Sequence, residues 1–181
     1  MTHSKRLIPI VLLAMSAGVL AHTSSKTLVR FDGAIGTDPL TASNGVDVLN
    51  VVRGVNPAGR AWVVRELRVS ISANGAIHGR AGGLLLASGD VIGTRAGVAQ
   101  VLATLACGAA NATATLFHSA PTALDTEGNF RLSGTLTQDG INAAVLPPTC
   151  DNPALLIRTV GANGAPGAWL AAGIPNAPGA D

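Results

Sequence analysis

The sequence predicts an all-β fold, namely a single-domain antiparallel β-sandwich of the Greek-key type, with a β-barrel as the alternative. After residue 26, short segments alternate apolar and polar side chains with a period of two, which is typical of half-buried strands. Gly, Asn and Pro residues interrupt these segments at regular spacing, as turns do in a sandwich or barrel. Outside the first 21 residues, no segment has a convincing helical period.

Ten segments are expected to form strands. In chain order they are residues 27–31, 46–53, 62–73, 76–80, 83–88, 98–107, 112–118, 130–137, 155–159 and 168–172. The segment 83–88 is apolar through its centre, which is typical of a strand that is covered on both faces. A loop that contains Asn163 and Gly164 is expected between the last two strands.

The clearest strand lies within residues 62–73. There Leu67, Val69 and Ile71 alternate with polar residues, so these three side chains are expected to be buried on one face and their polar neighbours to be more exposed. Asn74-Gly75 follows, a dipeptide that favours a tight hairpin turn because both residues tolerate a positive φ. The next strand is therefore expected to return alongside this one.

Cys107 and Cys150 are the two cysteines of the chain. An even number of cysteines in an exported protein favours one disulfide, and the alternative is two buried free thiols. The chain-entropy model assigns about 4 kcal/mol of stability to closing a loop of this length. We therefore expect a bridge between the two residues.

The first 21 residues have the composition of a secretory signal peptide. Lys5 and Arg6 precede an apolar run over residues 7–20, and Ala21 ends a short stretch of small and β-branched residues. A charged start, an apolar middle and a small residue before the cleavage point are the features that the export machinery reads. This pattern predicts a secreted protein, either extracellular or periplasmic.

Cleavage after Ala21 would leave a β-sandwich domain over residues 22–174 and a flexible tail over residues 175–181. Removal of Lys5 and Arg6 would leave ten basic and ten acidic residues, hence no net charge. The sequence contains no run of basic residues, so no nucleic-acid partner is expected. It has no polybasic amphipathic stretch after the signal either, so we expect no membrane insertion of the mature chain.

The composition is poor in charge and in aromatic rings. Charged residues make up 12% of the chain, which has two Trp, three Phe and no Tyr. Few aromatic rings weaken an interpretation as a carbohydrate-binding or single-strand-binding protein, because both classes usually stack their ligands on exposed rings. Low charge also reduces the cost of associating with another molecule.

Arginine dominates the basic residues after the signal, where Lys26 is the sole lysine. The nine arginines are Arg30, Arg53, Arg60, Arg65, Arg68, Arg80, Arg95, Arg131 and Arg158. One interpretation is a polar rim for a partner, because the planar guanidinium pairs well with carboxylates and carbonyls. The other, which we prefer from the sequence, is a genome rich in G and C that favours codons for Arg, Ala, Gly and Val.

A copper site is the alternative to a protein without catalysis. Cleavage after Ala21 would make His22 the first residue, whose amine and ring nitrogen can chelate Cu(II), and His78 or His118 could supply a further imidazole. Secreted copper oxygenases that attack polysaccharides resemble this arrangement, but this chain has no tyrosine. The simpler interpretation is a solvated His22 and two surface histidines, with no metal and no cofactor.

No motif of the sequence specifies a catalytic centre. No serine lies in the Gly-x-Ser-x-Gly context of a hydrolase nucleophile, and neighbours such as His118 and Ser119 point to opposite faces of a strand. Asp125, Glu127 and Asn129 resemble alternating calcium ligands, but three oxygen donors are too few. A polar hairpin turn is the favoured interpretation of this segment.

Several strand and turn signatures resemble small secreted bacterial proteins of unassigned function. They are residues 54–71 (GVNPAGRAWVVRELRVSI), 83–87 (GLLLA), 125–131 (DTEGNFR), 149–153 (TCDNP) and 169–174 (WLAAGI). The resemblance implies secretion and a β fold, and it transfers no activity. The sequence therefore predicts an exported, non-enzymatic protein that binds a protein or envelope partner, as an interaction module of the envelope or extracellular matrix, with a copper-dependent oxidative enzyme that uses His22 as the alternative.

Overall fold

The computed structural model of the protein describes residues 25–109 and 114–176. In this part of the chain the regular structure consists of thirteen β-strands and one three-residue 3₁₀ turn, so the predicted all-β class is confirmed. No helix in these residues is long and apolar enough to cross a membrane. The predicted signal peptide and most of the predicted tail lie outside the described residues.

Nine strands form the main sheet, and all their pairings are antiparallel. They are β1 (Thr27–Gly36), β5 (Glu66–Ser72), β6 (Ala76–Gly82), β8 (Gln100–Cys107), β9 (Thr115–His118), β10 (Thr122–Ala123), β11 (Phe130–Thr135), β12 (Ala154–Val160) and β13 (Pro166–Pro175). The four remaining strands form two small sheets. These are β2 (Leu40–Ser43) with β3 (Val46–Leu49), and β4 (Trp62–Val63) with β7 (Leu85–Leu86). The 3₁₀ turn η1 (Ala162–Gly164) lies in the expected loop between β12 and β13.

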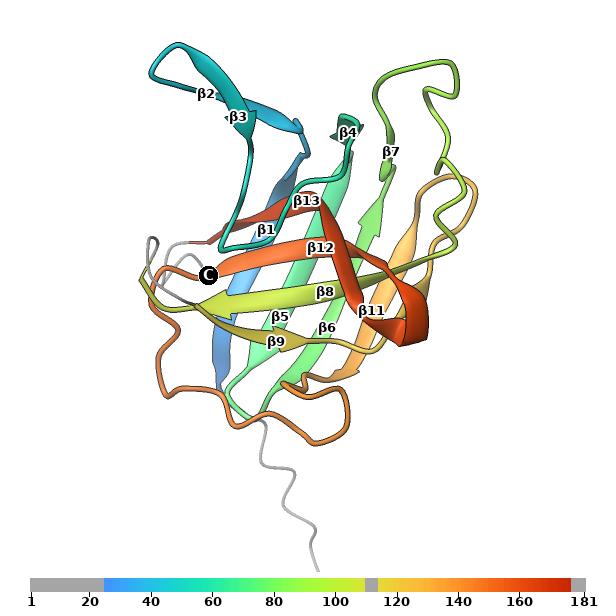
Figure 1. Ribbon diagram of the computed structural model, residues 1–181. Coiled ribbons are helices and arrows are strands. Elements are labelled where there is room, and N and C mark those ends of the chain that lie inside the picture. The colour runs from blue at the N-terminus through green and yellow to red at the C-terminus, as the bar shows by residue number, and fades with distance from the viewer. Residues whose placement is uncertain (1–24, 110–113, 177–181) are drawn as a thin grey trace, which may run out of the picture.

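The main sheet curls into two layers that face each other. Its strand order is β10-β8-β12-β13-β1-β5-β6-β11, with β9 paired to β8. In Figure 1, β8, β9, β12 and β13 run across the strands β1, β5, β6 and β11 behind them. The two ends of the sheet meet where His118 and Thr137 exchange backbone hydrogen bonds of 2.7 and 2.8 Å. The fold thus combines the packed layers of the predicted sandwich with the closure of the alternative barrel.

The core fills the space between these layers. Phe31, Leu67, Ile71, Leu105 and Leu155 are each at most 1% exposed and belong to one contiguous cluster. Every second residue of β5 contributes to this cluster, because successive side chains of a strand point to opposite faces. The predicted burial of alternate residues in this strand is therefore confirmed.

The hairpin that joins β5 and β6 forms where the sequence predicts it, but its turn is one residue longer than a two-residue turn. Three residues, Ala73, Asn74 and Gly75, connect the strands, and of these Gly75 alone has a positive φ, of 84°. The Gly75 N–H donates to the carbonyl of Ser72 at 2.9 Å. A three-residue hairpin loop needs the left-handed conformation at its last residue only, which Gly adopts without strain.

The predicted disulfide is present. Cys107, at the end of β8, is bonded to Cys150, and their Cα atoms are 4.9 Å apart. Arg53 supports the same region, because its guanidinium donates to the carbonyls of Gly108, at 2.9 Å, and Asn152. The bridge and this arginine tie the segment before β12 to the end of β8.

Three of the expected strands differ in the structure. The segment 83–88 forms a strand only at β7, Leu85–Leu86, and the short strand β10 was not expected. The segment 62–73 is interrupted at residues 64–65, so it forms β4 and β5 in different sheets. The segment 46–53 pairs only as far as Leu49, and it pairs with β2, a strand that was not expected. The hairpin of β2 and β3 is the main surprise of the fold.

Candidate functional site

The β2–β3 hairpin projects from one end of the molecule (Figure 1). All eight of its strand residues are exposed, so neither face of the hairpin is covered by the body. Asn44 and Gly45 form its two-residue turn with φ values of 52° and 78°, the conformation that a tight hairpin turn requires. A two-stranded hairpin without a covered face is at best marginally stable in water, so its base must hold it in place.

Hydrogen bonds of Thr37, Asn50 and Trp169 anchor the base of the hairpin. The Thr37 hydroxyl donates to the carbonyl of Trp169 at 2.9 Å, and the Thr37 carbonyl accepts from the Trp62 N–H at 2.8 Å. The Asn50 amide donates to the carbonyl of Asp38 at 3.0 Å, and the Trp169 indole donates to the carbonyl of Asn50 at 3.0 Å. Thr37 and Trp169 are buried. The β2–β3 hairpin, which we also call the arm, therefore has an anchored base and eight exposed strand residues.

Exposed apolar side chains gather at this end of the molecule. We call it the hairpin end and define it as residues 35–51, β4 and the loop of residues 87–99. Of the twelve large apolar side chains that are exposed in the described part of the chain, nine belong to it. They are Ile35, Leu40, Val46, Val48, Leu49, Val51, Val63, Val91 and Ile92. Clusters of this kind mark sites of association on monomeric surfaces.

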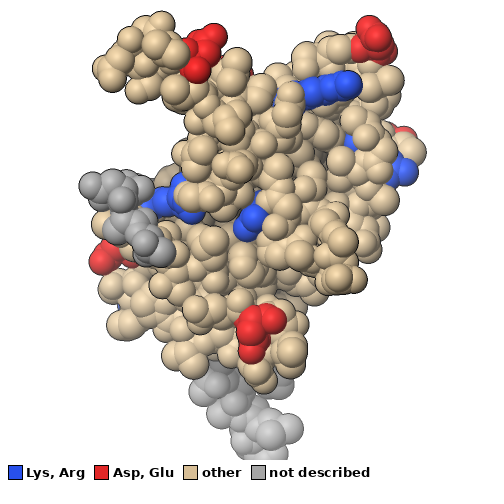
Figure 2. Space-filling view, viewed as in Figure 1, with Lys and Arg blue, Asp and Glu red and all other residues tan. Residues whose placement is uncertain are grey.

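A groove of about 570 Å³ lies at the foot of the 87–99 loop. Its walls include the buried Trp62 and Leu86 and the exposed Val91, with Arg60 as its charged residue. Figure 2 shows a recess between the hairpin and the 87–99 loop. The hairpin end thus offers an apolar arm and an apolar groove side by side.

A second cavity, of about 630 Å³, lies where the 87–99 loop meets the connection between β12 and β13. Gln100 and Thr159 are the residues with polar side chains in its lining, which otherwise consists of Gly, Ala, Val and Pro. The lining offers hydrogen bonds but no acid, base or nucleophile of the kind that catalysis uses.

The outer face of β1, β5, β6 and β11 carries a row of arginines. Arg68 of β5 pairs with Arg80 of β6, which in turn pairs with Arg131 of β11. Paired residues of neighbouring strands project from the same face, and all three side chains are exposed. We call Arg68, Arg80 and Arg131 the arginine row. Arg68 and Arg80 come from one hairpin, whereas Arg131 comes from β11, a strand that is distant in the sequence.

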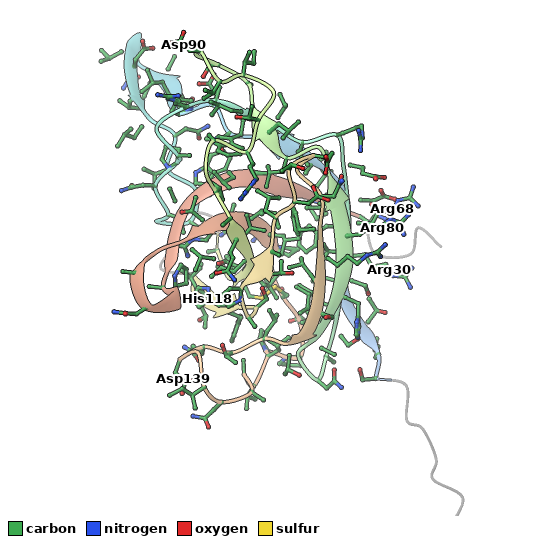
Figure 3. All side chains as sticks on the ribbon, turned by 90° about the vertical axis from the view of Figure 1, so that its right-hand side faces the viewer. Arg30, Arg68, Arg80, Asp90, His118 and Asp139 are labelled. Carbon is green, nitrogen blue, oxygen red and sulfur yellow. A yellow bond between two sulfur atoms is a disulfide. The ribbon has the colours of Figure 1, made fainter. Side chains whose placement is uncertain are left out.

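Asp32 of β1 ends this row, opposite Arg68. The Arg68 Nε lies 3.3 Å from an oxygen of Asp32, and the two side chains are 64% and 52% exposed. A pair with this exposure contributes little to stability. The next row on the same face begins with Arg30, which pairs with Ser70. Figure 3 shows Arg30, Arg68 and Arg80 on one side of the molecule.

Three of the other arginines serve the fold. Arg158 is 9% exposed, and it donates to the carbonyls of Gly167 at 2.7 Å and Pro166 at 2.9 Å. Arg95 donates to the carbonyl of Val98 at 2.7 Å, and Arg53 holds the disulfide region as described above. In all three cases the guanidinium donates to backbone carbonyls. The arginines of the chain therefore divide into a structural group and an exposed group.

Of the residues of the copper hypothesis, the structure describes His78 and His118, which lie on different strands. His22 lies outside the described residues. His78 is exposed on β6, whereas His118 lies on β9 in the other layer. Within residues 25–109 and 114–176, no group of three or more His, Cys, Asp or Glu side chains could hold a metal ion.

His118 belongs to a small polar cluster with Thr104 and Arg158. Its Nδ1 lies 2.9 Å from the Thr104 hydroxyl, which lies 3.5 Å from a nitrogen of Arg158. Burial, and then the positive charge of Arg158, lower the pKa of His118. Ser119 faces away, because its hydroxyl accepts from the Ala103 N–H at 2.9 Å. The cluster contains no carboxylate to orient the imidazole as a catalytic base.

The Asp125 turn has the polar hairpin geometry that the sequence favours. One carboxylate oxygen of Asp125 accepts from the N–H groups of Glu127 at 3.0 Å and Asn129 at 2.7 Å. The hydrogen bond from the Asn129 N–H is the main cause of the lowered pKa of Asp125. Gly128 has a φ of 76°, and a Cβ there would lie 2.5 Å from the carbonyl of Leu84. The Asp125 carboxylate therefore stabilises the turn in which it lies.

No family model, curated protein or solved structure matches this chain. The resemblance to small secreted bacterial proteins therefore stays a prediction from sequence signatures. The two surfaces described above are the observations from which a function can be argued.

Sequence reasoning missed both surfaces. Asn44-Gly45 is the same hairpin signal that located the turn after β5, and it would have placed β2 and β3. The alternation within β5 and β6 places Arg68 and Arg80 on outer faces, but no signal in the sequence says that β11 pairs with β6. The arginine row can therefore be recognised only when the order of the strands in the sheet is known.

Proposed function

We propose that the protein is an exported, non-enzymatic interaction module that binds a protein of the cell envelope or extracellular matrix at its hairpin end. The observation that carries this proposal is the β2–β3 hairpin, which exposes all eight strand residues although its base is anchored by buried groups. A partner that covers the arm would bury side chains that the fold itself leaves in water.

The mode of binding follows from the hairpin edges. β2 and β3 pair with each other along one edge, and the backbone of each strand has a second, outer edge. The two strands contain neither Lys nor Pro. Natural proteins commonly use such residues to protect exposed edges from pairing with other chains. A partner strand can add to either edge, while the apolar side chains of the hairpin contact the side chains of that strand.

Export is supported by two features. The N-terminal 21 residues have the order of charged, apolar and small residues that signal peptides share. The Cys107–Cys150 disulfide favours an oxidising compartment, because thiols stay reduced in the cytosol.

The test compares two double variants in cells that produce the protein. Val46→Ser with Leu49→Ser removes two apolar side chains of the arm, which are 63% and 56% exposed. Ile141→Ser with Val145→Ser removes two that are 84% and 92% exposed in the loop after β11, at the opposite end of the molecule (Figure 1). Both changes spare the core, so both proteins should fold.

The readout is the share of protein that stays with the envelope or matrix fraction after washing. The hairpin variant should be released into the medium, whereas the loop variant should be retained like the unchanged protein. Equal retention of the two variants would contradict the proposal.

A further inference from the structure

We propose that the arginine row is a binding site for an acidic polysaccharide, whose carboxylate or sulfate groups pair with Arg68, Arg80 and Arg131. The site lies on the outer face of β1, β5, β6 and β11 and is separate from the hairpin end. It does not depend on the function proposed above, because a different surface carries it.

The arginine row lowers the stability of the sheet. Arg80 has an arginine directly opposite on both neighbouring strands, Arg68 on one side and Arg131 on the other. Like charges directly opposite each other destabilise a sheet. Asp32 offsets the charge of Arg68 at one end of the row only. A bound polyanion would convert this repulsion into attraction.

The spacing of the arginine row suits a linear polyanion. Neighbouring strands lie about 4.8 Å apart, so the row presents guanidinium groups at regular intervals across a sheet. Regular spacing suits a linear polymer that carries an acidic group on successive sugars. Each guanidinium can bind a carboxylate or sulfate with two parallel hydrogen bonds.

The neighbouring row supplies polar groups for the hydroxyls of a sugar chain. Ser70 of β5 pairs with His78 of β6, and His78 pairs with Ser133 of β11, so the three side chains lie beside the arginines. Hydroxyl and imidazole groups both donate and accept hydrogen bonds. The face thus combines charge for acidic groups with hydrogen-bonding groups for the rest of each sugar.

Charge is distributed unevenly over the molecule. The outer sheet face holds Arg30 and the arginine row against the acidic residues Asp32 and Glu66. Most other acidic residues lie in loops and turns, namely Asp38, Asp90, Asp125, Glu127, Asp139 and Asp151. The face in Figure 2 carries only a few scattered charges. A chain with a formal net charge of only +2 therefore still has one basic face, which attracts anions locally.

Neither row contains Phe, Tyr or Trp, and this composition favours an acidic polysaccharide over a nucleic acid. Their members are Asp32, Arg68, Arg80, Arg131, Arg30, Ser70, His78 and Ser133. Single-stranded nucleic acids are usually held by bases stacked on Phe, Tyr or Trp, and neutral sugars are often held in the same way. Acidic sugars can be held through charge alone, so few aromatic residues do not argue against them.

The experiment measures binding of the purified, disulfide-bonded protein to four probes by calorimetry. Heparin supplies sulfates, polygalacturonate supplies carboxylates, dextran supplies neutral sugar, and a single-stranded oligonucleotide supplies phosphates with bases. Binding to heparin or polygalacturonate is expected, with the stronger of the two naming the acidic group, and dextran should not bind. The affinity should fall as salt rises, because counterions are released on binding.

The variants Arg80→Glu and Arg60→Glu change the net charge by the same amount. Arg80→Glu places a carboxylate in the middle of the row and should weaken binding at least tenfold, whereas Arg60→Glu, in the groove at the foot of the 87–99 loop, should leave the affinity within about twofold. Circular dichroism of both variants checks that they fold. Equal losses in the two variants, tighter binding to the oligonucleotide than to either acidic polymer, or no binding to any probe would overturn the proposal.

Discussion

Replacing Arg80 with Glu should stabilise the protein. In the structure Arg80 is the middle of three arginines in register, so the substitution replaces two repulsive pairs by two attractive pairs. A cross-strand charge pair is worth roughly 0.2–1 kcal/mol. Two such pairs predict a gain of about 1 kcal/mol in the free energy of unfolding at low salt, reduced by a few tenths because Glu favours strands slightly less.

Calorimetry at two salt concentrations tests this gain. For a domain of this size, about 1 kcal/mol corresponds to a rise in melting temperature of roughly 2–4 °C. The rise should nearly vanish at about 1 M salt, where charges are screened within about 3 Å. Arg80→Gln, which removes repulsion without adding attraction, should give an intermediate rise. A lower melting temperature for Arg80→Glu at low salt, or a rise that salt does not change, would refute the reasoning.

Three further predictions concern the disulfide, the hairpin base and a histidine. Replacing both Cys107 and Cys150 with Ala should lower the free energy of unfolding by about 4 kcal/mol in urea titrations, because the bridge closes a loop with a sequence separation of 43. An unchanged urea concentration at the midpoint of unfolding would contradict this. Gly36→Ala should detach the hairpin and make residues 37–50 sensitive to brief proteolysis, because a Cβ there would lie 1.9 Å from the carbonyl oxygen of Trp62; unaltered cleavage would show that the base can adjust. The pKa of His118 is lower in the folded protein than in the unfolded chain. Below about pH 6.5 the unfolded chain therefore binds a proton at His118 more readily than the folded protein does. The free energy of unfolding is highest above that pH and decreases as the pH falls toward the folded pKa. His118→Gln should flatten this part of the melting-temperature profile, and an equally steep profile in the variant would exclude His118 as the cause.

The predictable parts of the fold are those in which one strand face is buried. Leu67, Val69 and Ile71 alternate because the interior selects every second residue, and this period is visible in the sequence. The β2–β3 hairpin is different, because both its faces are in water and burial selects no period. Alternation predicted a strand over residues 46–53, which contains β3, but β2 was not predicted, and the Asn44-Gly45 turn is the signal that would have located it.

Strand order explains why the surfaces were not predicted. Arg131 reaches Arg80 because β11 pairs with β6 across almost fifty residues of intervening chain that fold elsewhere. Alternation fixes which face a residue occupies but says nothing about which strand lies beside it. Arg158 is an example in the other direction. The sequence does not distinguish it from the exposed arginines, but it is buried and donates to backbone carbonyls.

Covalent capture at the hairpin tests the central claim most directly. A photoreactive phenylalanine analogue is introduced at Val46, on the arm, and in a separate protein at Val145, which lies at the opposite end and is more exposed, at 92% against 63%. The two proteins are irradiated in intact producing cells, and excess unlabelled protein serves as competitor. We predict one discrete adduct of defined mass from Val46, absent with competitor and absent from Val145. Adducts that are equal at both positions, or that the competitor does not reduce, would contradict a specific partner at the hairpin end.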